Sequence, residues 1–209
     1  MKTKRITKKG IVVLFFTLSI FIAVAVLQAF ISAHNILNFF IRFFGLWGYL
    51  SMAIAAIMTP FLKEINQMFG RPFLIIHHIF AYAGLFLITL HPIFFAIYSS
   101  TIDVFIPDFS SWYNFWLTAG RPSLIVLYIA LIAILLRRKI KPWRIIHALM
   151  HLMLLLGFIH AILIGTDFNS KAILVIYSVV FAAVIVSFII KRLQFYRNLI
   201  KKKKIQKGW

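Results

Sequence analysis

Residues 73–98 read FLIIHHIFAYAGLFLITLHPIFFAIY, an apolar run that has no Lys, Arg, Asp or Glu but includes three histidines. About 20 consecutive apolar residues in a helix cross the hydrocarbon core of a bilayer, so this run is long enough to span a membrane. An ionisable side chain inside a membrane is costly and marks a candidate functional site. The same stretch therefore predicts both the fold and the place of the function.

The composition of the whole chain is also that of a membrane protein, with many hydrophobic and few charged residues. Of its 209 residues, 63% are hydrophobic and 13% are charged, whereas soluble domains average about 45–50% apolar and about 25% charged. A mean hydropathy of +0.97 agrees with these fractions, and a water-soluble globular fold is excluded. The absence of cysteine also excludes disulfides, cysteine-ligated zinc, iron–sulfur clusters and thiol catalysis.

Six apolar runs predict an all-α integral membrane protein, a bundle of six transmembrane helices. Lipid offers no partners to backbone N–H and C=O groups, so each run must pair them within its own helix. The fourth run is the weakest, because Arg121 and Pro122 lie near its start. The bundle would occupy residues 11–190, between a basic N-terminus (1–10) and a basic tail (191–209). The predicted spans are residues 11–33, 43–62, 73–98, 116–136, 145–164 and 172–190.

The basic residues predict the orientation of this bundle. The chain has 23 Lys and Arg against 4 Asp and Glu, a net charge of +19 at pH 7. With the N-terminus inside, all but Arg42, Arg121 and Lys171 fall on the cytoplasmic side, as the positive-inside rule requires. We therefore expect a multi-pass cell-membrane protein with both termini in the cytoplasm. The basic tail is interpreted as a contact with lipid headgroups rather than with nucleic acid.

Six of the seven histidines fall in the third and fifth spans, and His34 is interpreted as an interfacial residue. His77 and His91 are 14 residues apart and His147 and His160 are 13 apart, rises of about 21 Å and about 19.5 Å. The two spans run in the same direction, so each carries one histidine near the inner surface and one near the outer. Neutral imidazole is a good ligand for iron, and two imidazoles that face each other provide the axial ligands of a haem.

A near-repeat supports the choice of the inner pair. Residues 71–77 (RPFLIIH) and 141–147 (KPWRIIH) each place a basic residue and a proline at the membrane edge, and a histidine five residues after the proline. This favours His77 over its neighbour His78 as the ligand. His78 and His151 are interpreted as polar residues satisfied between helices.

The expected angles around the helix axis favour one shared face for the two ligands of the third span, but not for those of the fifth. At about 100° per residue, His77 and His91 lie within about 40° of one face, whereas His147 and His160 lie about 140° apart. We expect Gly157 to permit a π-bulge or a close haem approach that accommodates this difference.

Two arginines complete the expected outer site. Arg42 and Arg121 lie on the outer side, where the propionates of a haem would need cationic partners. An anionic electron acceptor would find the same charges. Snorkelling of each side chain to the interface is the competing interpretation.

The paired histidines resemble those of the ferric reductase-like transmembrane domain. NADPH oxidases, ferric reductases and the haem-binding membrane subunit of the bacterial methionine sulfoxide reductase system share this domain. Residues 77–91 look like its most characteristic stretch, and residues 45–60 are weakly similar to the second helix of the methionine sulfoxide reductase subunit. The resemblance covers residues 43–190.

This resemblance implies a membrane cytochrome b, an oxidoreductase component that passes electrons outward through two haems b to an extracytoplasmic acceptor. His77 with His147 would ligate the inner haem, and His91 with His160 the outer one. Only 19 residues follow Ile190, and they hold no glycine-rich nucleotide loop or flavin domain. We therefore expect a cytosolic flavoprotein reductase or a membrane quinol to supply the electrons.

Two alternatives stay open at this point. One is the haem-binding membrane subunit of an extracytoplasmic methionine sulfoxide reductase. The other, from a different class, is a metal-ion or proton transporter that uses histidines as binding or relay groups. A transporter would need acidic partners in the bundle, and no Asp or Glu lies in the middle of a predicted span.

Overall fold

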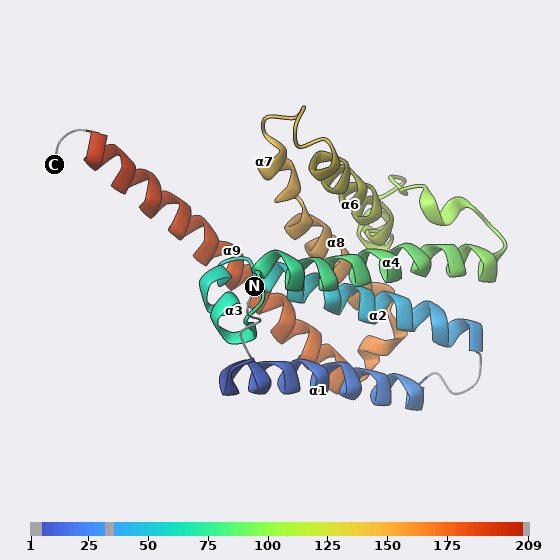
Figure 1. Cartoon of the computed structure of the whole chain (residues 1–209). Coiled ribbons are helices and arrows are strands. Elements are labelled where there is room, and N and C mark those ends of the chain that lie inside the picture. The colour runs from blue at the N-terminus through green and yellow to red at the C-terminus, as the bar shows by residue number, and fades with distance from the viewer. Residues whose placement is uncertain (1–5, 32–35, 207–209) are drawn as a thin grey trace.

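The computed structural model describes residues 6–31 and 36–206, and within these ranges every regular element is a helix (Figure 1). His34 and the first five residues of the predicted N-terminal segment lie outside the described ranges. The longer helices are α1 (Lys8–Ile31), α2 (Ile36–Ile57), α4 (Phe73–Ser99), α6 (Gly120–Leu135), α8 (Met150–Ile164) and α9 (Lys171–Gln206). The short elements between them are α3 (Leu62–Phe69), η1 (Asp103–Phe105), α5 (Trp112–Leu117), α7 (Trp143–His147) and η2 (Thr166–Asn169).

Five helical segments are long and apolar enough to cross a membrane. The protein therefore has the features of an all-α membrane protein, as the sequence predicts. The segments are Lys8–Phe30, Ile36–Ile57, Phe73–Ser99, Trp143–Ile164 and Lys171–Lys201.

The weakest predicted span is shorter in the structure than the sequence suggests. Two turn residues, 118 and 119, separate α5 from α6, and α6 has 16 residues. At 1.5 Å per residue, α6 is about 24 Å long, less than the roughly 30 Å of a bilayer core. A sixth crossing would therefore need α5 and this turn in addition to α6.

Helix α2 forms the centre of the molecule and packs against α1, α4, α8 and α9. Its contact with α4 is close because both helices place glycine there. A Cβ atom at Gly48 would lie 2.8 Å from the backbone nitrogen of Ile88, and one at Gly84 would lie 2.9 Å from that of Met52. Small residues allow membrane helices to approach each other in this way. The glycines thereby hold the histidine-bearing α4 directly against α2.

Helix α9 continues without a break from the last apolar run into the basic tail. Its 36 residues make it about 54 Å long, and its C-terminal part stands clear of the bundle (Figure 1). Lys191 Nζ and Gln194 Nε2 each donate a 3.2 Å hydrogen bond to a backbone carbonyl in the turn after α2. These bonds fix the direction in which the tail leaves the bundle.

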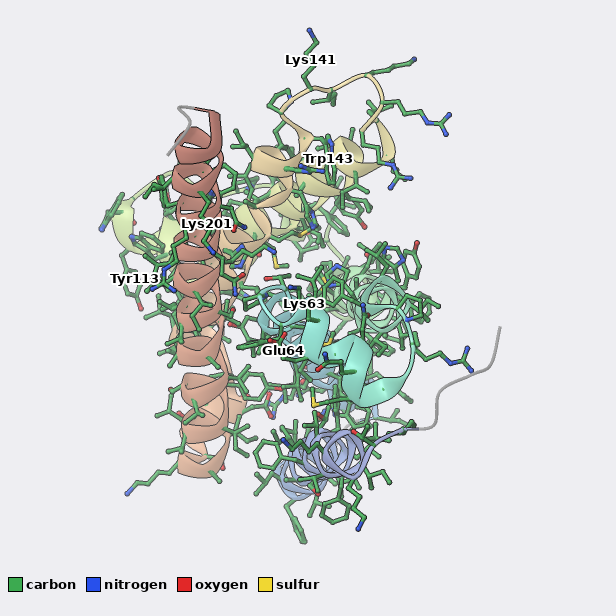
Figure 2. All side chains as sticks on the ribbon, turned by 60° about the vertical axis from the view of Figure 1, so that its left-hand side comes forward. Lys63, Glu64, Tyr113, Lys141, Trp143 and Lys201 are labelled. Carbon is green, nitrogen blue, oxygen red and sulfur yellow. The ribbon has the colours of Figure 1, made fainter. Side chains whose placement is uncertain are left out.

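Basic side chains come from several elements near this end of the molecule. Figure 2 shows Lys63 on α3, Lys141 in the turn before α7, and Lys201 on α9. These three residues belong to the segments that the sequence assigns to the cytoplasmic side.

Candidate functional site

A cavity of about 500 Å³ lies between α2, α4, α6 and α8, and residues of the connecting segments line the end that the sequence predicts to face outward. This size is within the range of about 300–1,000 Å³ that is typical of small-molecule and cofactor sites. His91, His160, Arg42 and Arg121 all line the cavity. The structure therefore brings together the four residues that the sequence predicts for the outer site.

The cavity reaches from the outer end of the bundle to its middle. On α2 its lining begins at Asn38 and ends at Tyr49, and on α8 it runs from Met153 to Ile164. Each of these stretches covers 11 residue steps, a rise of about 16.5 Å. The cavity thus occupies about half the thickness of a bilayer core.

Both outer histidines are held in the tautomer that suits metal ligation. His91 Nδ1 lies 2.8 Å from the carbonyl oxygen of Ile41, and His160 Nδ1 lies 2.9 Å from that of Leu117. A carbonyl oxygen only accepts, so each Nδ1 carries the proton and donates it. The Nε2 lone pair of each ring remains for a ligand. Metal-ligating histidines usually donate their other N–H to a carbonyl or carboxylate in this way.

Two glycines make room for these imidazoles. A Cβ atom at Gly45 would lie 3.0 Å from Nδ1 of His91. One at Gly120 would lie 2.8 Å from Nε2 of His160 and would cover that nitrogen. Glycine at position 120 therefore keeps the expected ligand atom open. The sequence analysis missed both glycines, because glycine is common in membrane helices and its neighbours are known only from the fold.

The expected inner pair is also brought together, but it is held less completely. His77 Nδ1 lies 3.1 Å from the carbonyl oxygen of Ala55. His147 Nδ1 is buried and has no hydrogen-bond partner among the described residues. His77 and His147 lie close enough for their imidazoles to interact electrostatically, and so do His91 and His160. Each predicted pair thus comes from two helical segments, one histidine from α4 and the other from α7 or α8.

Helix α2 supplies the carbonyl acceptors for two of the histidines of α4, His77 and His91. Ile41 and Ala55 are 14 residues apart, as are His91 and His77 on the antiparallel α4. The equal separations allow one helix to orient both imidazoles at their two depths. The sequence analysis missed this role because a backbone acceptor leaves no mark in the sequence.

The fifth predicted span contains an irregularity, but not the π-bulge expected at Gly157. Helix α8 is α-helical through Gly157, and the break lies at residues 148 and 149, between α7 and α8. There the backbone N–H of Leu149 donates to the carbonyl of Ile146, three residues earlier. Such 3₁₀ turns rotate the chain by about 120° per residue instead of about 100°. The extra rotation turns His147 toward the face of His160.

The two outer arginines both have partners within the protein. Arg42 Nη1 lies 3.4 Å from Oδ1 of Asp167, and its Nε donates to Asn38 at 3.1 Å. Arg121 Nη1 donates to the carbonyl oxygen of Ile106 at 2.7 Å. Arg42 is thus part of a built ion pair beside the cavity. The sequence analysis missed Asp167 as its partner because 125 residues separate the two.

The segment between α4 and α6 contributes to the outer end of the cavity. Val104 of η1 is buried and lines the cavity, and Arg121 binds the carbonyl of Ile106 close by. Hydrogen bonds from Ser110 hold the pKa of Asp108 below its usual value, and the nearby charge of Arg121 acts in the same direction. Exposed aromatic side chains follow in this segment, which is the composition of a membrane interface. They are Phe109, Trp112 and Tyr113.

No group of three or more His, Cys, Asp or Glu side chains that could hold a bare metal ion occurs within residues 6–31 and 36–206. Comparison of the chain with protein-family models, with curated proteins and with solved structures found no match.

Proposed function

We propose that this chain is a six-helix membrane cytochrome b that passes electrons outward to an extracytoplasmic acceptor. Helix α6, with α5 and the turn before it, would supply the sixth crossing. Both termini would lie in the cytoplasm, where the positive-inside rule places the basic residues. The observation that carries the proposal is the outer cavity, which His91 of α4 and His160 of α8 both line.

The chemistry of this cavity fits a haem b. Two imidazoles have their Nδ1 atoms engaged by backbone carbonyls, which leaves Nε2 of His91 and of His160 as axial ligands. The walls between them are mostly apolar, with residues such as Leu46, Ile88 and Phe158. Arginines at the outer end are suitable partners for propionates. These features together match an amphipathic, carboxylate-bearing macrocycle.

The residues of the chain would bind and tune this group rather than act as acids or bases. When bound, a haem supplies a one-electron redox centre, and the surrounding protein sets its potential. The carbonyls of Ile41 and Leu117 orient the two ligand rings, and the apolar walls exclude water. The positive charges of Arg42 and Arg121 would favour the arrival of negative charge at the outer end.

A second haem is proposed at the inner pair, between His77 and His147. Electrostatic contact between these imidazoles and the bond from His77 Nδ1 to Ala55 support this assignment. Electrons would reach the inner site from a cytosolic flavoprotein reductase or a membrane quinol. They would leave from the outer site to an extracytoplasmic acceptor.

The haem content of the purified protein tests the proposal directly. The full chain, expressed in cells supplied with a haem precursor and purified in detergent, is expected to show b-type bands after reduction with dithionite. A pyridine haemochrome assay should give about two haems per chain. His78→Ala is the matched control, because His78 neighbours His77 but is exposed, and it should keep both haems. A colourless preparation would overturn the proposal and favour the transporter interpretation of the histidines.

A further inference from the structure

One acidic side chain is built into the wall of the outer cavity. Asp167, in η2, is only 5% exposed and lines the same cavity as His91 and His160. A buried carboxylate is unfavourable unless it is well paired. Its ion-pair partner Arg42 stands 3.4 Å away and also donates to Asn38. The negative charge of Asp167 is therefore only partly compensated.

Two charged or titratable groups among the described residues act on Asp167. Arg42 approaches it from α2, and Tyr177 from α9 lies within electrostatic reach. The hydroxyl of Tyr177 donates instead to the carbonyl oxygen of Leu46 at 2.9 Å. Burial raises the pKa of Asp167, and the opposing effect of Arg42 does not cancel this rise. Asp167 thus holds its proton at a higher pH than an exposed aspartate does.

A carboxylate-bearing ligand in the cavity would add to this effect. Arg42 is the cation nearest to Asp167 that the structure shows, and one guanidinium cannot neutralise two carboxylates. If a propionate shares Arg42, the negative charge of Asp167 becomes still less favourable. Each further negative charge in the cavity then favours protonation of Asp167.

We propose that Asp167 takes up a proton when the outer site is reduced. This inference rests on the proposed function. With a haem bound, reduction of the outer site would add one electron from the reductant, and so one negative charge, to the cavity. One proton from the external water binds a carboxylate oxygen of Asp167 and removes one negative charge. The net charge of the cavity is unchanged, and no other bond forms or breaks.

The proposal predicts how the midpoint potential of the outer site depends on pH. Reduction that takes up a proton becomes harder as protons become scarcer, so the potential should fall as the pH rises. The limiting slope for one proton per electron is about 59 mV per pH unit, because 59 mV is a tenfold change in the equilibrium constant of a one-electron couple. The inner site lies away from Asp167 and should show a flatter response.

Optical redox titrations of the haem-loaded full chain between about pH 5 and pH 9 test this prediction. We expect Asp167→Asn to flatten the slope of the outer site, and Asp167→Glu to retain most of it. Asp103→Asn is the matched control, because Asp103 is an exposed acid of the same outer region, and it should leave the slope unchanged. An Asp167→Asn protein with the slope of the parent chain would overturn the inference.

A second measurement needs no substitution and covers the case in which Asp167→Asn does not fold. The chain has only four acidic side chains, so a redox difference infrared spectrum should contain few carboxyl bands. Reduction of the parent chain should produce a band of a protonated carboxylic acid. Aspartate labelled with ¹³C in its carboxyl group should shift this band, whereas a haem propionate would not respond. A spectrum without a label-sensitive band would overturn the inference.

The two proposals fail in distinguishable ways. A protein without haem would contradict the cytochrome and the proton uptake together. A protein that binds haem and has a pH-independent outer potential would contradict only the role of Asp167.

Discussion

The outer pair, His91 and His160, and the inner pair, His77 and His147, have nearly the same separation in the sequence. The protein nevertheless holds the two pairs by different hydrogen bonds. At the outer end both Nδ1 atoms donate to carbonyls of other helical segments. At the inner end only His77 has such a bond, and His147 Nδ1 is buried without a partner among the described residues. The outer site is thus preorganised for two axial ligands, whereas half of the inner site is not.

His151 is a further histidine at the inner end, and it also has a buried ring nitrogen that is unsatisfied among the described residues. His151 follows His147 by one helical turn, and its Nδ1 is bonded within its own segment to the carbonyl of Ala148. Its Nε2 is buried without a partner in the described part of the chain, and its ring packs on Phe188. A buried polar atom without a partner costs about 1–3 kcal/mol. Two such atoms, Nδ1 of His147 and Nε2 of His151, make the inner end the less completely satisfied of the two ends.

Removal of single ligands should give the largest effects. We expect His91→Ala and His160→Ala each to lower the haem content from about two per chain to about one, because a haem that loses one of two axial imidazoles is held much less tightly. His77→Ala should remove the other haem. Pyridine haemochrome assays and the number of redox transitions report both outcomes. If His91→Ala retained both haems and both transitions, the outer ligand assignment would be wrong.

The inner end offers a direct choice between two neighbouring histidines. We expect His147→Ala to remove the inner haem and His151→Ala to retain it. His77 acts electrostatically on His147, whereas the groups that act on His151 are the carbonyl of Ala148 and Arg192. Haem content and the low-spin spectrum of each variant distinguish the two residues. The reverse result would make His151 the ligand and would move the inner site toward α9.

The sequence predicted which histidines lie near one another but not what holds their rings, and the reason is physical. An apolar run with an ionisable residue at each end shows the span and the depth of His77 and His91 without knowledge of any partner. What holds these rings is invisible in the sequence, because the acceptors are backbone carbonyls of α2. The break between α7 and α8 was also not predicted, since residues 148 and 149 are Ala and Leu, both good helix formers.

The sequence also predicted most of the membrane helices, but not every break between them or the contacts between distant segments. Long uncharged runs identify membrane helices, and five of the six predicted spans correspond to helical segments long enough to cross. The run at 116–136 was predicted as one span because its turn at residues 118 and 119, Thr and Ala, carries no Gly or Pro signal of its own. The ion pair of Arg42 and Asp167 depends on the packing of η2 against α2, which no local pattern contains.

Substitution of Gly120 should have an intermediate effect on haem affinity, and only at the outer site. We expect Gly120→Ala to weaken haem binding at the outer site about tenfold or more, a loss of about 1.4 kcal/mol. The added methyl group would lie 2.8 Å from Nε2 of His160. Titration of the apo-protein with haemin measures the affinity of the outer site. An unchanged affinity in Gly120→Ala would show that Gly120 does not protect the ligand atom.

The smallest expected effects concern two tyrosines between the outer and inner levels. The ring centroids of Tyr49 and Tyr177 lie 5.8 Å apart with the rings tilted at 42°. Of the two hydroxyls only that of Tyr177 has a partner, the carbonyl of Leu46 at 2.9 Å. The Tyr49 hydroxyl is buried without one in the described structure. Loss of an unpartnered buried group removes a penalty of about 1–3 kcal/mol, whereas loss of one bonded partner leaves the other unsatisfied. We therefore expect Tyr49→Phe to raise the melting temperature of the detergent-solubilised apo-protein slightly and Tyr177→Phe to lower it.

The same pair of variants also tests where the outer cavity ends. Tyr49 lines its inner end, and on α2 it lies between Ile41 and Ala55, which set the two histidine depths. If the hydroxyl only packs against apolar atoms, Tyr49→Phe should keep the full haem content. A haem lost from either site on Tyr49→Phe, with the apo-protein still more stable, would instead make this hydroxyl a ligand-binding group. The outer and inner sites would then share a polar contact at the middle of the bundle, and the potential of the haem that remains should also change in this variant.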